Sequence, residues 1–83
     1  MAEFTVKVIT QIGATPDTGR KLCIVRGVSA VNSDTLTVTP LTTVEGAFLI
    51  STTGTVGTMT FATNVITVTN GSTLTWTGLA WGT

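Results

Sequence analysis

Few side chains in this chain are of a type that does chemistry. The sequence has no histidine, and its single cysteine, Cys23, lies in the apolar stretch Leu22-Cys23-Ile24-Val25. A catalytic thiol or hydroxyl needs a paired base or another cause of a lowered pKa. We therefore interpret Cys23 as a small buried apolar side chain and predict no serine or threonine nucleophile. The protein is predicted not to be an enzyme.

The carboxylates are also poorly placed for metal chemistry. There are four, and they are scattered along the chain: Glu3, Asp17, Asp34 and Glu45. A structural zinc or calcium site needs several ligands gathered in one cluster. The sequence predicts no metal site and no cofactor.

One triplet, Asp17-Thr18-Gly19, resembles the active-site loop of aspartic proteases, some of which are small all-β homodimers. Two such carboxylates that share a proton supply a general acid and a general base. In that family the triplet follows an apolar strand, whereas here it follows Ala14-Thr15-Pro16 and precedes Arg20-Lys21. Because Pro, Asp and Gly are typical of turns, we interpret the triplet as a surface turn.

Charge is distributed very unevenly. The last charged residue is Glu45, and residues 46–83 contain no Asp, Glu, Lys, Arg or His. Exposed sheet edges are normally protected by charge, so this half of the chain is predicted to be coated with hydroxyl groups or covered by a partner. The four basic residues are Lys7, Arg20, Lys21 and Arg26, and the net charge is zero. This is too little positive charge for nucleic-acid binding.

No segment is predicted to direct the chain to a membrane or out of the cell. The N-terminal residues lack the features of a secretory signal, and the apolar runs are too short to span a bilayer. A single free thiol fits synthesis in a reducing cytoplasm. A chain of 83 residues buries only about 60–65% of its unfolded surface. Without a disulfide or a metal, oligomerisation is the expected reinforcement.

The composition predicts an all-β protein. Thr, Val and Ile make up 36 of the 83 residues, and β-branched side chains favour strands. Alternating apolar residues and turn residues predict seven or eight short strands in a compact antiparallel β-sandwich or small barrel. The whole chain, 1–83, is predicted to form a single domain. Strands are expected over residues 4–8, 21–25, 28–31, 35–39, 44–50 and 55–62, followed by a final hairpin.

Several local features are predicted from parity, that is, from which residues of a strand alternate onto the same face. Phe4, Val6 and Val8 should share one buried face, and residues 11–19 should form a long loop. Residues 21–25 are apolar enough to be covered on both faces, with a bulge at Gly27. A turn is expected at Gly54.

The final hairpin is predicted from the need to bury four apolar residues together. A three-residue loop, Thr69-Asn70-Gly71, pairs Ile66 with Leu74 and places Val68 and Trp76 on the same face, with Gly71 in the left-handed conformation.

The C-terminal residues Trp76, Leu79 and Trp81 form an apolar cluster, and both tryptophans of the chain fall within its last eight residues. One interpretation is that they complete the core, because Trp is strongly buried on average. The other is that they anchor a partner, because Trp is enriched at interface hot spots. Together with Phe4, these three residues are the predicted contact residues.

In size and in its Thr- and Gly-rich, charge-poor composition, the whole chain resembles small bacteriophage virion proteins, in particular capsid decoration (cement) proteins. The resemblance implies a compact β domain, often a homotrimer, located in the virion. Its expected partners are its own copies and a major capsid or other virion protein, with no small-molecule substrate. The alternatives are a tail, fibre or other β-assembly subunit, and a small carbohydrate- or ice-binding module. The Thr-x-Thr units suggest ice binding, but they follow no fixed period.

Overall fold

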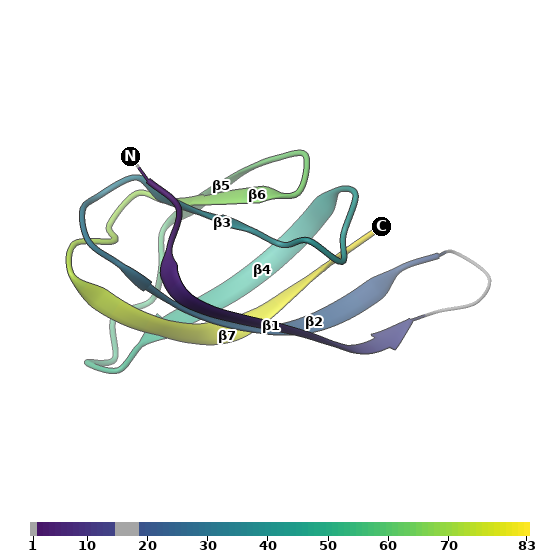
Figure 1. Ribbon diagram of the computed structural model, residues 1–83, viewed down its shortest axis with the longest axis horizontal. Coiled ribbons are helices and arrows are strands. Elements are labelled where there is room, and N and C mark those ends of the chain that lie inside the picture. Colours follow the sequence, from purple (N-terminus) through teal and green to yellow (C-terminus); the bar gives the residue numbers. More distant parts are fainter. Residues whose placement is uncertain (1, 15–18) are drawn as a thin grey trace.

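A computed structural model describes residues 2–14 and 19–83, in which every regular element is a β-strand. The strands are β1 (Thr5–Ala14), β2 (Lys21–Ser29), β3 (Asp34–Thr37), β4 (Val44–Ser51), β5 (Met59–Ala62), β6 (Val65–Val68) and β7 (Leu74–Gly82). They form a four-stranded antiparallel sheet, β1-β2-β7-β4, and a three-stranded one, β3-β6-β5, stacked as two layers (Figure 1). The predicted all-β antiparallel fold is confirmed, in a sandwich-like arrangement.

Backbone hydrogen bonds join the two sheets at both sides. At one side, Phe4 N–H donates to the Thr35 carbonyl at 2.7 Å, and Thr35 N–H donates to the Ala2 carbonyl at 2.8 Å, before the chain crosses over to become β1. At the other side, Ile50 of β4 forms a bridge with Val56. The sandwich therefore has features of a flattened barrel, in which closure removes much of the exposed edge.

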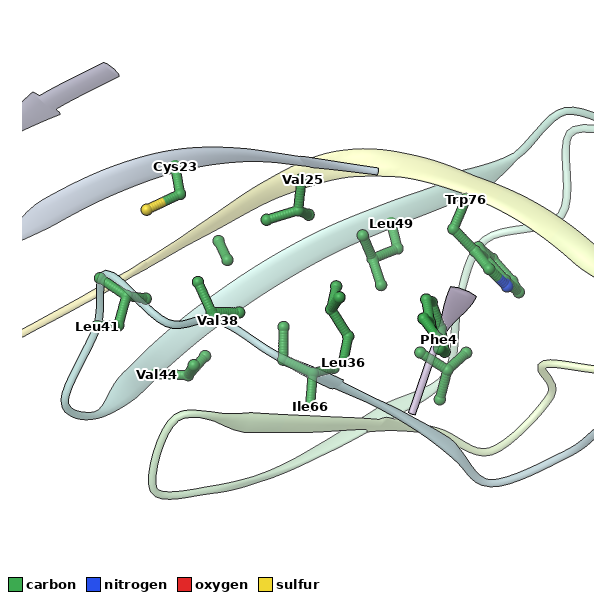
Figure 2. Close-up of a cluster of buried hydrophobic side chains, with 12 residues drawn as sticks. Phe4, Cys23, Val25, Leu36, Val38, Leu41, Val44, Leu49, Ile66 and Trp76 are labelled. Carbon is green, nitrogen blue, oxygen red and sulfur yellow. The ribbon is translucent and has the colours of Figure 1, made fainter. Parts of the chain in front are cut away.

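The core lies between the two sheets. Figure 2 shows Cys23, Val25, Leu49 and Trp76 pointing from the four-stranded sheet towards Leu36, Val38 and Ile66 in the opposite layer, and all seven are fully buried. The strands expected over residues 35–39 and 44–50 are confirmed as β3 and β4, and Leu36 and Val38 face inward between threonines. The predicted turn at Gly54 is also confirmed, with φ of 91°.

The buried indole of Trp76 is held by a polar contact as well as by packing. Its Nε1–H donates to Ser29 Oγ at 2.9 Å, and the Ser29 hydroxyl donates in turn to the carbonyl of Gly71. Trp76 and Ser29 are both fully buried. The two hydrogen bonds satisfy polar groups whose burial would otherwise be costly.

The prediction for the first strand is wrong in its faces. Phe4 is buried, but Val6 is 75% exposed and Val8 56% exposed. Val6 has φ of 50°, in the left-handed region, which breaks the alternation. Thr5 lies opposite Val28 and Val8 lies opposite Arg26, so β1 carries one extra residue there. This irregularity is a β-bulge, and it leaves Val6 and Val8 outside the core.

The bulge predicted at Gly27 is therefore located in β1 instead. In its pairing with β7, β2 runs through Gly27 without a register shift. A Cβ atom at Gly27 would lie 2.8 Å from Cδ2 of Phe4. Gly27 is thus explained by the close approach of the Phe4 ring, because any larger side chain would displace it.

The predicted final hairpin is wrong in its pairing. β6 pairs with β3 and β5, whereas β7 lies in the other sheet between β2 and β4. Residues 69–73 therefore cross between the layers, and Gly71 is not left-handed. The apolar side chains of β6 and β7 still share one core, but they reach it from opposite sheets.

Two boundaries also differ from expectation. β1 continues to Ala14, inside the stretch predicted to be a loop, whereas residues 15–18 lie outside the described part of the chain. β5 covers only Met59–Ala62 of the strand predicted over 55–62. The long β1–β2 hairpin extends beyond the smaller sheet (Figure 1), and the molecule measures 38 × 21 × 19 Å.

Candidate interaction face

The outer surface of the four-stranded sheet is unusually apolar. In β7 the inward residues Trp76 and Ala80 are buried, so the alternate residues Leu79 and Trp81 point away from the core. Register places Ile24 opposite Leu79, and Leu79 opposite Phe48. Cross-strand neighbours on one face lie within contact distance, so these three side chains form one row across β2, β7 and β4.

Two further rows extend this surface. Trp81 lies opposite Leu22 on one side and Gly46 on the other, and Thr77 lies opposite Arg26 and Ile50. Five of the large apolar side chains are between 37% and 48% exposed, and the sixth, Leu22, is half-buried. We call this set the apolar face; it comprises Leu22, Ile24, Phe48, Ile50, Leu79 and Trp81.

Trp81 leans towards β4 and leaves a hollow on its other side. A Cβ atom at Gly46 would overlap the indole ring of Trp81, so the ring covers Gly46 closely. Beside Trp81, a hollow of about 290 Å³ is lined by Gly13, Ala14, Arg20, Lys21, Leu22 and Trp81. Most of its exposed lining is apolar. Gly13 pairs with Leu22, and Leu22 pairs with Trp81, so these three lining residues share the outward side of the sheet with the apolar face.

The charged groups near this end of the face are already engaged within the chain. Arg20 Nε lies 2.8 Å from Glu45 Oε1 in an exposed ion pair. Lys21 Nζ donates to the carbonyl of Pro40 at 3.1 Å. Within the three rows, Arg26 is the charged residue, and it lies at the margin. The face therefore has an apolar centre and a polar rim, as protein interfaces do.

The outer surface of the three-stranded sheet has the opposite character. Thr35 pairs with Thr67, and Thr67 pairs with Thr60, so three hydroxyl groups form one row across β3, β6 and β5. Their neighbours Leu36 and Ile66 point into the core and are fully buried. One face of the sandwich thus carries a row of hydroxyl groups, and the other carries rows of large apolar side chains.

The predicted contact residues divide between core and surface. Phe4 is 2% exposed and Trp76 is fully buried, so both belong to the core. Leu79 and Trp81 are 37% and 39% exposed and lie on the apolar face. Their role as contacts stays a prediction.

Ile24, Phe48 and Ile50 were not predicted to be surface residues, although the sequence carried a signal for them. Residues 21–25 were expected to be covered on both faces because they are apolar at both parities. The structure covers the inward residues Cys23 and Val25 and leaves Ile24 43% exposed. That expectation is wrong for the isolated chain, because only the inward face of β2 is packed against other residues.

The groups considered for chemistry are placed as follows. Cys23 is fully buried, and burial raises the pKa of its thiol, although Lys21 partly opposes the shift. Asp17 and Thr18 of the protease-like triplet lie outside the described residues, and Gly19 is exposed. Among residues 2–14 and 19–83, no three His, Cys, Asp or Glu side chains gather as metal ligands. The same part of the chain has no helix long and apolar enough to cross a membrane.

Asp34 is a buried carboxylate with a structural task. It accepts hydrogen bonds from the N–H groups of Ala30 at 2.7 Å, Val31 at 3.1 Å and Ala2 at 2.9 Å. The bonds from Ala30 and Val31 hold its pKa below the ordinary value, with a smaller contribution from Ala2, and outweigh the opposite effect of burial. The carboxylate thereby ties the β2–β3 turn to the N-terminal segment.

Glu3 ties that segment to β3. Burial acts to raise its pKa, but hydrogen bonds from Thr37 and the charge and hydrogen bond of Lys7 lower it. Thr37 N–H donates to Glu3 Oε2 at 2.6 Å, and Lys7 Nζ donates to the same atom at 2.9 Å. Glu3 and Asp34 thus both hold the N-terminal segment in place through hydrogen bonds with backbone N–H groups.

Comparisons with protein-family models, with curated proteins and with solved structures find no match for this chain. Its function is therefore inferred from its own residues and their geometry.

Proposed function

We propose that this chain is a non-enzymatic structural subunit of a larger protein assembly, of the capsid decoration type, and that its apolar face is buried against a neighbouring protein. The observation that carries the proposal is the composition of β2 and β4. Both strands have large apolar residues pointing inward and outward, yet the fold covers only the inward side. A contiguous exposed apolar surface of this kind marks an interaction site on a small protein.

The side chains on the face favour contact over catalysis. Its centre consists of aliphatic and aromatic groups, which bind by burial and shape. Leu79 lies in the middle row, flanked by Ile24 and Phe48. A small β domain that offers such a face, with a neutral opposite surface, has the physical properties that a shell-bound virion protein needs. The virion location comes from the resemblance in size and composition, and it belongs to the same proposal.

The assembly role can be tested in the cells that make the protein. The chain should co-sediment with large protein particles in a density gradient, in many copies per particle. A Leu79→Lys variant should be lost from those particles, because a charge at the centre of the face would have to be desolvated. Val31→Lys is a matched control, since Val31 is 51% exposed and lies between β2 and β3, outside the apolar face. A wild-type chain that sediments only at its own small mass would overturn the proposal.

A second candidate is a small carbohydrate-binding module, favoured by the hollow beside Trp81. An indole wall next to polar groups suits a sugar ring, and Arg20 and Lys21 line the same hollow. Adding a panel of glycans should then shift the fluorescence of Trp81 in a Trp76→Phe variant. Unchanged emission across the panel would eliminate this candidate.

A further inference from the structure

The apolar face carries both a projecting side chain and a hollow. Phe48 is 48% exposed, the largest exposed fraction within the face. The hollow beside Trp81 lies across the sheet, over β2 and β1, whereas Phe48 is on β4. Leu79 lies between them, in the same row as Phe48 and on the strand that carries Trp81.

A projection and a hollow on one surface can be exchanged by a two-fold axis. If two copies face each other about an axis that passes between Phe48 and the hollow, each Phe48 meets the hollow of the other copy. Such a contact is isologous: the same face of both copies is buried in it. No further copy can then add to that face, so the contact produces a dimer and not a fibre. The Leu79 side chains of the two copies then lie near the centre.

The size of the face matches what a stable pair requires. Five side chains that are 37–48% exposed supply on the order of 400 Å² of apolar surface, at about 200 Å² for each large side chain. A standard interface buries about 800 Å² per partner, of which roughly 60% is apolar. The apolar area of the face is therefore close to the apolar area that one partner contributes to a standard interface.

The charge distribution also fits a second copy. The centre of the face has no charged group, so two identical faces place no like charges opposite each other there. Near the hollow, Arg20 is paired with Glu45 at 2.8 Å. Arg26 lies at the margin of the rows, where water can solvate it. An acidic or basic partner would find no complementary charge at the centre of this face.

We infer that the neighbour of the apolar face is a second copy of this chain, with Phe48 of each copy seated in the hollow beside Trp81 of the other. The inference rests on the proposed function and names the partner of the same face. It differs from the homotrimer implied by the resemblance to decoration proteins, because a face-to-face contact joins two copies. The assembled unit would then present two hydroxyl-coated outer surfaces.

The test uses the purified full chain alone, measured by light scattering and sedimentation across a dilution series. The wild type should show twice the monomer mass of 8.6 kDa at high concentration and dissociate on dilution. Phe48→Lys should weaken the pairing by at least about thirtyfold for each of its two sites, as expected for a hot-spot side chain.

Gly13→Leu tests the hollow separately. A Cβ atom at Gly13 meets nothing within 4 Å and its backbone is not left-handed, so a side chain there should fill the hollow without disturbing the fold. This variant should weaken the pair, whereas Val31→Lys should leave it intact. Circular dichroism and thermal unfolding of each variant confirm that the monomer fold is kept.

Three outcomes would overturn the inference: a wild type that stays monomeric at every concentration, a trimer, or a dimer that tolerates both Phe48→Lys and Gly13→Leu. These outcomes are distinct from failure of the assembly role. A chain that is monomeric alone but bound to particles refutes only the pairing. A dimer that never joins a particle refutes the assembly role and keeps the pair.

Discussion

The two tryptophans of β7 provide a matched pair of substitutions, because one belongs to the core and the other to the apolar face. Trp76 is fully buried and Trp81 is 39% exposed. We expect Trp76→Phe to be strongly destabilising and Trp81→Phe to be nearly neutral in the monomer. The same chemical change at two positions of one strand thus separates the inner side of the sheet from the outer side.

The magnitude follows from what each indole contacts. Removing part of the Trp76 ring leaves a cavity that costs about 2 kcal/mol, roughly half the loss for full truncation of a buried Trp. Loss of the hydrogen bond from Nε1 to Ser29 Oγ adds about 1 kcal/mol. The sum, about 3 kcal/mol, is a large share of the roughly 4–12 kcal/mol expected for a chain of this length. For Trp81→Phe we expect less than about 1 kcal/mol.

Urea unfolding followed by circular dichroism measures both changes, at protein concentrations low enough for the chain to be monomeric. Each variant also keeps a single tryptophan as a reporter. Trp76 alone should emit at short wavelength and resist acrylamide, whereas Trp81 alone should emit further to the red and be quenched readily. Equal losses of stability, or equal quenching of the two reporters, would refute the assignment of β7 to a core side and an open side.

Three further outcomes follow from single residues. Because the folded state lowers the pKa of Asp34, its contribution to stability is present above the ordinary value near 4 and is lost as pH falls below it; urea midpoints should therefore drop in acid, and Asp34→Asn should flatten that dependence. Gly46→Ala should displace the Trp81 ring, costing about 1 kcal/mol as a lost apolar contact and shifting the Trp81 emission to the red; unchanged emission would contradict the close contact. Cys23, fully buried with a raised pKa, should react with a thiol reagent only as fast as the protein opens, and rapid labelling under native conditions would show that the strand is accessible.

The sequence was sufficient to predict the strands that follow simple alternation. Leu36 and Val38 alternate with threonines, and that pattern correctly indicated which residues enter the core. It was insufficient where the backbone departs from the regular strand. Nothing in the residue type of Val6 indicates a left-handed conformation, and this one residue moves Val8 out of the predicted buried face.

The pairing of β6 and β7 shows a different limit. Parity states which side chains must be buried together, and Ile66 and Trp76 are indeed both buried. It does not state whether they reach the core from one sheet or from two. A hairpin and a crossover between layers bury the same residues, so local pattern alone could not separate them. The decision depends on contacts with β3 and β2, which are distant in the sequence.

The absence of charge after Glu45 has separate explanations at the edges and on the faces. The two longest strands of this half differ in exposure: β7 is central in its sheet, and β4, whose one charged residue is Glu45, is joined at Ile50 to Val56 by a backbone bridge. β7 therefore has no free edge, and the bridge covers part of the edge of β4 without charge. On the outer face of the smaller sheet, hydroxyl groups such as those of Thr60 and Thr67 can form hydrogen bonds with water.

Neither closure nor hydroxyl groups explain the outward positions of β4 and β7. Phe48, Leu79 and Trp81 occupy places where a solvent-facing strand ordinarily carries threonine, lysine or glutamate. The same chain supplies threonines freely across the smaller sheet, so polar residues were available to it. Large apolar side chains at these positions are what burial against another surface requires, and the hollow and projection on that surface supply the shape for a second copy of the same face.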